Sequence, residues 1–264
     1  MVLIRHAISA CGVRRPVGVM SGVSLSLSVG LLCSAASGEI TILGASHDNT
    51  LYEAEDGNLS NGAGEYLFAG TTNQSKVRRG LMSFDFSAIP QGATITSVSL
   101  RLFSSMGQPL EANVSLHRAL GAWGEGASDA QNNEGSGADA ELGDATWLHS
   151  FYNNQFWQNI GGDFSADVSA TTTIGLNADF YHWSGTGMTA DVQAWVAGTV
   201  TNNGWFLLGQ EPGFGTAKRF SSRENATISQ RPQLTVEWVV PAPGTVAVMA
   251  LAACIGRRRR RIEG

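Results

Sequence analysis

Short runs of alternating apolar and polar residues make up most of the chain between residues 39 and 238. The alternation is clear in Leu81–Phe86 and again in Ile95–Phe103, and a Pro-Gln-Gly turn at 90–92 separates the two runs. A period of two places every second side chain on one face of a strand, which predicts half-buried strands here. Trp205–Leu208 is apolar at every position, which predicts a short, fully buried central strand.

These runs occur early and late in the chain, and no regular series of helices separates them. Such an order favours a sandwich or jelly roll over an alternating α/β fold. We therefore expect the all-β class, as a two-sheet antiparallel jelly-roll sandwich with one short helix and long polar loops.

The expected helix lies near residues 188–199, where apolar residues recur at helical spacing. Thr189 is the expected cap, and the helix is expected to cover an open end of the sandwich. The segment from Gly124 to Asp144 is long and polar, so it is expected to be a functional or disordered loop.

Residues 1–38 have the composition of a secretory signal peptide. Arg5, Arg14 and Arg15 supply its positive charge, Val17–Leu32 is uncharged and mostly apolar, and small residues follow at 34–38. A retained membrane anchor and twin-arginine export are the alternatives. We expect an exported protein cleaved by signal peptidase.

Residues 240–264 combine a Pro-Ala-Pro-Gly motif at 241–244, an apolar segment, and the arginine block Arg257–Arg261. The uncharged stretch from Trp238 to Gly256 is close to the ~20 residues that cross a bilayer. A frayed basic tail or a nucleic-acid patch is the alternative. The tail resembles PEP-CTERM sorting signals, with Ala242 in place of Glu. The resemblance implies transient membrane association, an exosortase-like transpeptidase as partner, and a final location at the cell surface or outside a bacterium with an outer membrane.

The two ends hold eight of the 17 basic residues and all the cysteines. The chain has 17 basic and 22 acidic residues, and residues 39–239 keep nine and 21 of them, which gives that segment a net charge of −12. Such a charge argues against nucleic-acid binding. With Cys11, Cys33 and Cys254 all outside residues 39–239, a disulfide framework or a thiolate site is not expected in that domain.

Several separated motifs in residues 48–238 resemble, in order, DNRLRE-type domains. The clearest are Asp48-Asn-Thr-Leu51, Arg79–Pro90, Trp123-Gly-Glu-Gly126 and Arg231-Pro-Gln-Leu234. The resemblance implies a jelly-roll domain of secreted bacterial proteins, and some relatives bind acidic polysaccharides such as alginate. Ser221 stands where the family pattern suggests Asp, which would weaken a cation site if that Asp serves one in relatives.

Two sets of loop residues are candidates for ligand contacts. Calcium prefers hard oxygen ligands from bendable loops, and aromatic faces stack on sugars. For the acidic residues, the alternatives are carboxylates that are merely solvated, or a different calcium cluster at Glu53, Glu55 and Asp56. For the tryptophans, the alternative is that they seal the core. The calcium candidates are Glu125, Asp129, Asp144 and Asp163, and the glycan candidates are Trp123, Trp147, Trp157 and Trp183.

Catalytic motifs are missing from the sequence. The histidines have no zinc spacing, and no Gly-x-Ser-x-Gly elbow supports a hydrolase triad. We therefore expect a non-catalytic surface or matrix protein that binds an acidic or neutral polysaccharide. A purely structural or adhesive component is the second hypothesis, and a polysaccharide-degrading enzyme is the third.

Overall fold

The computed structural model describes residues 38–107 and 110–241. The predicted signal peptide and sorting tail fall almost wholly on residues 1–37 and 242–264, outside the described residues. Within the described ranges, no helix has the length and apolar character that crossing a membrane requires. The strands are β1 (Gly38–Tyr52), β2 (Leu59–Ser60), β3 (Tyr66–Thr71), β4 (Val77–Phe84), β5 (Thr94–Gly107), β6 (Ala112–Ala119), β7 (Ala138–Asp139), β8 (His149–Phe151), β9 (Gln155–Phe156), β10 (Phe164–Ile174), β11 (Asp179–Ser184), β12 (Trp205–Leu208), β13 (Lys218–Ser221) and β14 (Gln233–Val239); the helices are α1 (Thr186–Val196) and the 3₁₀ turn η1 (Ile228–Gln230).

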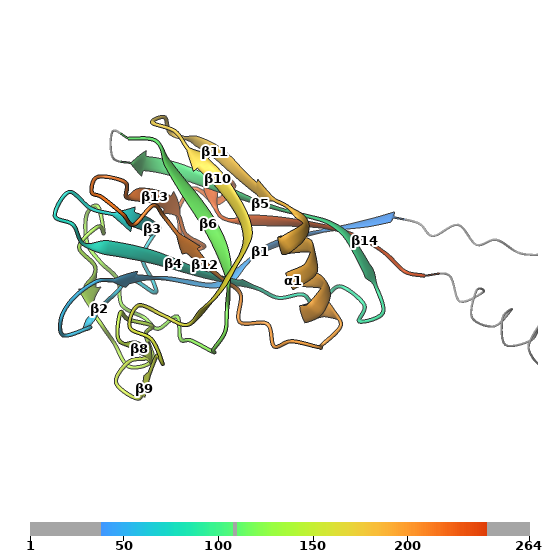
Figure 1. Ribbon diagram of the computed structural model, residues 1–264, viewed down its shortest axis with the longest axis horizontal. Coiled ribbons are helices and arrows are strands. Elements are labelled where there is room, and N and C mark those ends of the chain that lie inside the picture. The colour runs from blue at the N-terminus through green and yellow to red at the C-terminus, as the bar shows by residue number, and fades with distance from the viewer. Residues whose placement is uncertain (1–37, 108–109, 242–264) are drawn as a thin grey trace, which may run out of the picture. The chain divides into compact units, whose positions relative to one another are not determined.

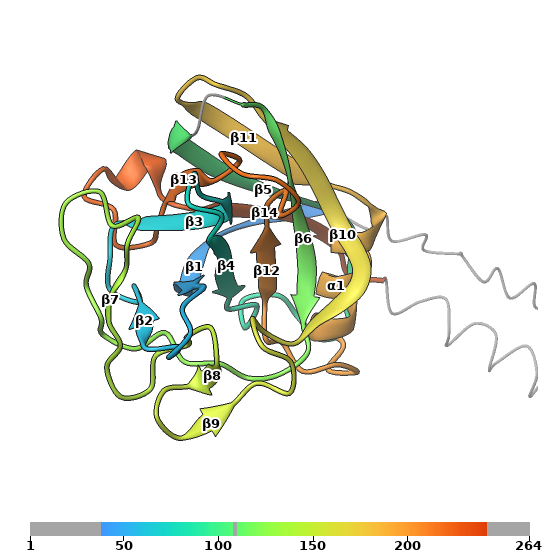
Figure 2. The same ribbon diagram turned by 60° about the vertical axis from the view of Figure 1, so that its left-hand side comes forward.

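Ten of the strands form one antiparallel sheet that folds back on itself (Figures 1 and 2). Its pairs are nested along the chain: β1 with β14, β3 with β13, β4 with β12, β5 with β11 and β6 with β10. A long antiparallel ribbon wound in this way is the topology of a jelly roll. The predicted all-β antiparallel sandwich is thus confirmed.

Strand β1 joins the two layers. Its first half, Gly38–Gly44, pairs with β14, and after a bulge between Ala45 and His47 its second half pairs with β4. A bulge bends a strand and lets it pass from one layer to the other. One layer therefore holds β14, β5 and β11, and the other holds β4, β12, β6 and β10.

The main core lies between the layers and follows the alternation in the sequence. Val98, Leu100 and Leu102 of β5 are buried as predicted. Helix α1 packs against β5 and β10 at one end of the sandwich (Figure 1), with Met188 and Val192 buried. The helix begins at Thr186 after Gly185, so the prediction that Thr189 caps it is wrong.

A second apolar cluster covers the outer face of the β4–β12–β6 layer. Leu81, Phe206 and Leu208 point outward from that layer and pack against Ala145 and Trp157. The last two belong to the long segment between β6 and β10, which includes the small β8–β9 pair (Figure 2). Because β12 has a core on both faces, all four of its residues are buried, as the apolar run predicted.

Candidate functional site

The four candidate tryptophans have different surroundings. Trp183 lies in β11 and is 0% exposed, with its Nε1 donating to the Val114 carbonyl, so its placement in a polar loop was wrong. Trp157 is in the predicted loop region but is only 7% exposed and packs on Phe206. Trp183 packs in the main core and Trp157 in the second apolar cluster, so neither ring is exposed enough to stack on a ligand.

Trp123 and Trp147 are half-buried. The Arg79 guanidinium lies over the Trp147 ring, 4.8 Å from its centroid. Trp123 donates to the Asn203 carbonyl and contacts His47 edge-to-face. Trp123 also lines a hollow of about 180 Å³, together with residues that include Ser83 and Asn202.

Of the four candidate calcium ligands, Asp163 and Asp144 accept hydrogen bonds within their own loops, and Asp129 is exposed. Asp163 accepts hydrogen bonds from the backbone of Gln158 and Asn159, and Asp129 is exposed. Asp144 is buried and accepts from the Glu141 amide at 2.6 Å, and burial raises its pKa. The structure therefore does not gather the predicted four residues around one point.

Glu125 belongs instead to a group that the sequence-based prediction missed. Asp48 in β1, Glu125 in the loop after β6, and Glu224 after β13 each offer a carboxylate oxygen, and these oxygens lie within 4.8 Å of one another. Within the described ranges, no other group of three acids, histidines or cysteines comes together in this way. Ser221, where an acid was expected, is fully buried and lies outside this group.

One guanidinium serves the group. Arg223 Nε lies 2.6 Å from Glu125 Oε1 and 2.8 Å from Glu224 Oε1, and the Arg223 amide donates to Asp48 Oδ2 at 2.7 Å. The Asp48 amide donates in turn to Glu125 Oε1 at 2.7 Å. Asp48 Oδ1 and Glu224 Oε2 are buried, with no hydrogen-bond partner among the described residues.

Burial and mutual repulsion disfavour the ionised carboxylates. Burial raises the pKa of Asp48 well above its usual range, and Glu224 raises it further. Burial also raises the pKa of Glu224 to about 7, although Arg223 opposes the rise. Ionising all three carboxylates would therefore leave negative charge that Arg223 alone does not balance.

Neighbouring polar residues hold this group in place. Asn49 Nδ2 donates to the Glu125 carbonyl at 2.7 Å, while Asn49 Oδ1 accepts from the backbone of Thr50 and Asn61. The Glu125 backbone also passes so close to Gly62 that a Cβ there would lie 1.8 Å from the Glu125 carbonyl oxygen. Asp48–Thr50 are three consecutive polar residues, and the structure buries all three.

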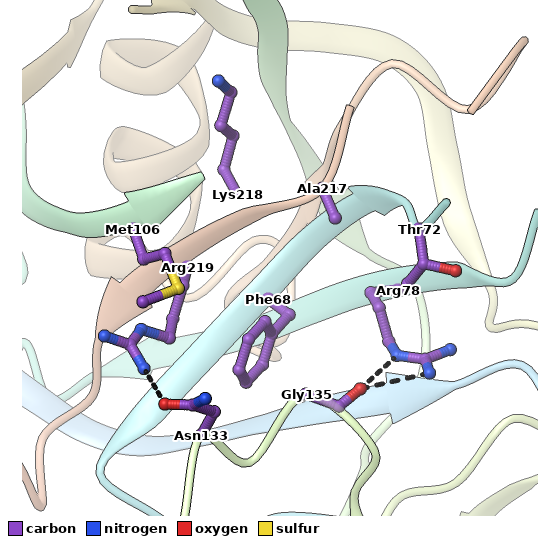
Figure 3. A pocket seen from close by; sticks show the side chains of 9 residues that line it. All are labelled: Phe68, Thr72, Arg78, Met106, Asn133, Gly135, Ala217, Lys218 and Arg219. Carbon is purple, nitrogen blue, oxygen red and sulfur yellow. Dashed lines mark hydrogen bonds between the residues drawn. The ribbon is translucent and has the colours of Figure 1, made fainter. Parts of the chain in front are cut away.

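A separate pocket of about 260 Å³ lies beside β3 and β13 (Figure 3). Phe68 lies between Arg219 on one side and Arg78 on the other, with Met106 near Arg219. Lys218 also lines the pocket, but its side chain points away (Figure 3), and its ammonium donates to main-chain carbonyls. The pocket lining contains no acidic residue.

Arg219 presents its guanidinium in a fixed plane. It lies over the Tyr66 ring, 3.9 Å from the centroid, while its Nε donates to Ser105 Oγ at 3.0 Å and its Nη1 to Asn133 Oδ1 at 3.5 Å. Arg78 donates to the Gly135 carbonyl at the other side of the pocket. Two guanidinium groups without a carboxylate partner in the pocket lining can accept an anionic ligand.

Comparison with models of known protein families gives no match, and comparison with curated proteins gives none either. The resemblance to DNRLRE-type domains and to PEP-CTERM signals therefore stays an expectation from the motifs.

Proposed function

We propose that this protein is an exported, non-catalytic surface or matrix protein whose sandwich binds an acidic polysaccharide at the pocket of Figure 3. One observation carries the proposal: in a domain with 21 acidic and nine basic residues, the guanidinium groups of Arg78 and Arg219 line this pocket and none of the described acidic residues does. Opposite charge in a concave site favours an anionic ligand such as a uronate.

The pocket combines the two kinds of contact that a charged sugar needs. The planar Arg219 guanidinium suits a carboxylate because it can donate two parallel hydrogen bonds. The exposed Met106 and the edge of Phe68 supply apolar surface for the ring. Trp123 is held in a separate hollow with amide and hydroxyl groups, so we keep it as a second candidate contact for a neutral part of the chain.

Export is the other half of the proposal, and the chain ends support it. The signal-peptide-like residues 1–38 and the sorting-like residues 240–264 imply passage through signal peptidase and an exosortase-like transpeptidase. Mass spectrometry of the protein recovered from cells should then find neither Met1 nor Arg257–Arg261. Recovery of the intact chain from the cytoplasm would contradict export.

Binding is tested by titrating the protein with polyuronate and with a neutral polysaccharide. We expect Arg219→Gln to weaken polyuronate binding about tenfold to a hundredfold, since a charge-assisted hydrogen bond contributes about 1.5–3 kcal/mol. Arg101→Gln is the matched control, because Arg101 also lies over an aromatic ring, that of Phe180, away from the pocket. Equal loss in both variants would contradict the assigned site.

The two other hypotheses make different predictions in the same assay. If no polysaccharide binds in the titration, a purely structural or adhesive component is favoured. Shortened chains in the mixture would favour a polysaccharide-degrading enzyme.

A further inference from the structure

Among the described residues, the group formed by Asp48, Glu125 and Glu224 has only one positively charged side chain, Arg223, paired with its carboxylates. Arg223 pairs with two of the three carboxylates, and with all three ionised the four side chains carry a net charge of −2. Arg231 is close enough to lower the pKa of Glu224, but its Nε donates to the Asn225 carbonyl. Buried carboxylates need a compensating proton, ion pair or metal.

We propose that one Ca²⁺ ion binds to Asp48, Glu125 and Glu224. The strongest support is Asp48, whose side chain is 0% exposed and whose Oδ1 has no hydrogen-bond partner among the described residues. Its other oxygen, Oδ2, is fixed by the Arg223 amide, and one oxygen of Asp48 reaches the carboxylate group. Asp48 therefore brings a buried carboxylate with one unpaired oxygen next to two further carboxylates, and such a carboxylate can serve as a cation ligand.

The spacing of the oxygens suits calcium. Calcium binds oxygen at about 2.3–2.6 Å, so ligands on opposite sides of the ion lie about 5 Å apart. The three oxygens fit that limit because they lie within 4.8 Å of one another. Magnesium requires about 2.0–2.1 Å and a near-ideal octahedron, which demands a tighter group. Water and main-chain carbonyls would complete the six to eight ligands that calcium takes.

The ion would join three segments that are distant in sequence. Glu125 lies 77 residues after Asp48, and Arg223, next to Glu224, lies 175 residues after Asp48. A ligand that binds only when these segments are assembled stabilises the folded state by mass action. The site is therefore structural, and it is independent of glycan binding at the pocket of Figure 3.

The test compares thermal unfolding of the full-length protein in EDTA, in millimolar CaCl₂ and in millimolar MgCl₂. At a hundredfold excess over the dissociation constant, calcium should raise the melting temperature by about 5–10 °C. Isothermal titration with CaCl₂ should show one ion per chain. Glu224→Gln and Asp48→Asn should lose both responses, while Asp129→Asn, which removes an exposed carboxylate outside the group, should keep them.

Three results would overturn the proposal. The first is an unchanged melting temperature with calcium, and the second is an equal rise with magnesium, which would indicate charge screening. The third is a normal calcium response in Glu224→Gln. Glu224 is partly exposed, so this variant serves the test even if Asp48→Asn does not fold.

Discussion

Arg219 and Arg223 lie four residues apart, on either side of the end of β13, yet their surroundings have opposite charge. Arg223 is within 3 Å of two carboxylates and has Asp48 beside it. Arg219 rests on Tyr66 in a pocket with no acidic residue in its lining. The same residue type therefore pairs with carboxylates in one place and packs on an aromatic ring in the other. The difference lies in which distant segments meet each end of the strand.

The largest expected effect concerns strand β13, which carries Arg219 and ends two residues before Arg223. Trp183 packs edge-to-face on Phe220, which lies between Arg219 and Arg223. Trp183→Ala should cost about 3–5 kcal/mol, since a fully buried Trp is replaced by a cavity. The melting temperature should fall by roughly 10 °C in thermal unfolding.

Trp123→Ala is the control for that prediction. Trp123 is half-buried beside a hollow, so its removal should lower the melting temperature clearly less. Similar melting temperatures for the two variants would mean that Trp183 does not anchor β13.

The second prediction tests the two arginines directly. Arg223→Gln should cost about 3 kcal/mol, because it leaves the carboxylates without their ion pair. Arg219→Gln should cost about 1 kcal/mol, through the lost ring contact and hydrogen bond. Both are measured by urea unfolding without calcium. If Arg219→Gln is the more destabilising of the two, the proposed contrast between the two sites fails.

The third prediction concerns the close approach of Gly62 to the Glu125 backbone. Gly62→Ala should cost about 1–3 kcal/mol, since the new Cβ forces the Glu125 backbone away. Calorimetry should show weakened calcium binding and unchanged polyuronate binding. Gly44→Ala is the matched control, because a Cβ at Gly44 meets nothing within 4 Å. If Gly62→Ala weakens polyuronate binding as much as it weakens calcium binding, the two sites are coupled.

The candidate sites were less predictable than the fold. Glu125 lies in an acidic group, but the group does not include its predicted partners: Asp144 and Asp163 accept hydrogen bonds within their own loops, and Asp129 is exposed. The actual partners, Asp48 and Glu224, come from strand β1 and from the turn after β13. Spacing along the chain carries no signal for such a group, because its members meet only through the nested strand pairs.

What the sequence determined by itself was the local pattern: the strands with period two, the fully apolar strand β12, the short helix and the all-β class. These follow from the direction of each side chain relative to its neighbours, and they need no distant contact. Tertiary structure alone decided that Trp183 is a core residue, that the loop after β6 covers the outer sheet face, and that Arg219 and Arg223 have opposite surroundings. The physical reason is that strand register and loop packing bring together residues more than a hundred positions apart, and the charge around a side chain depends on those residues.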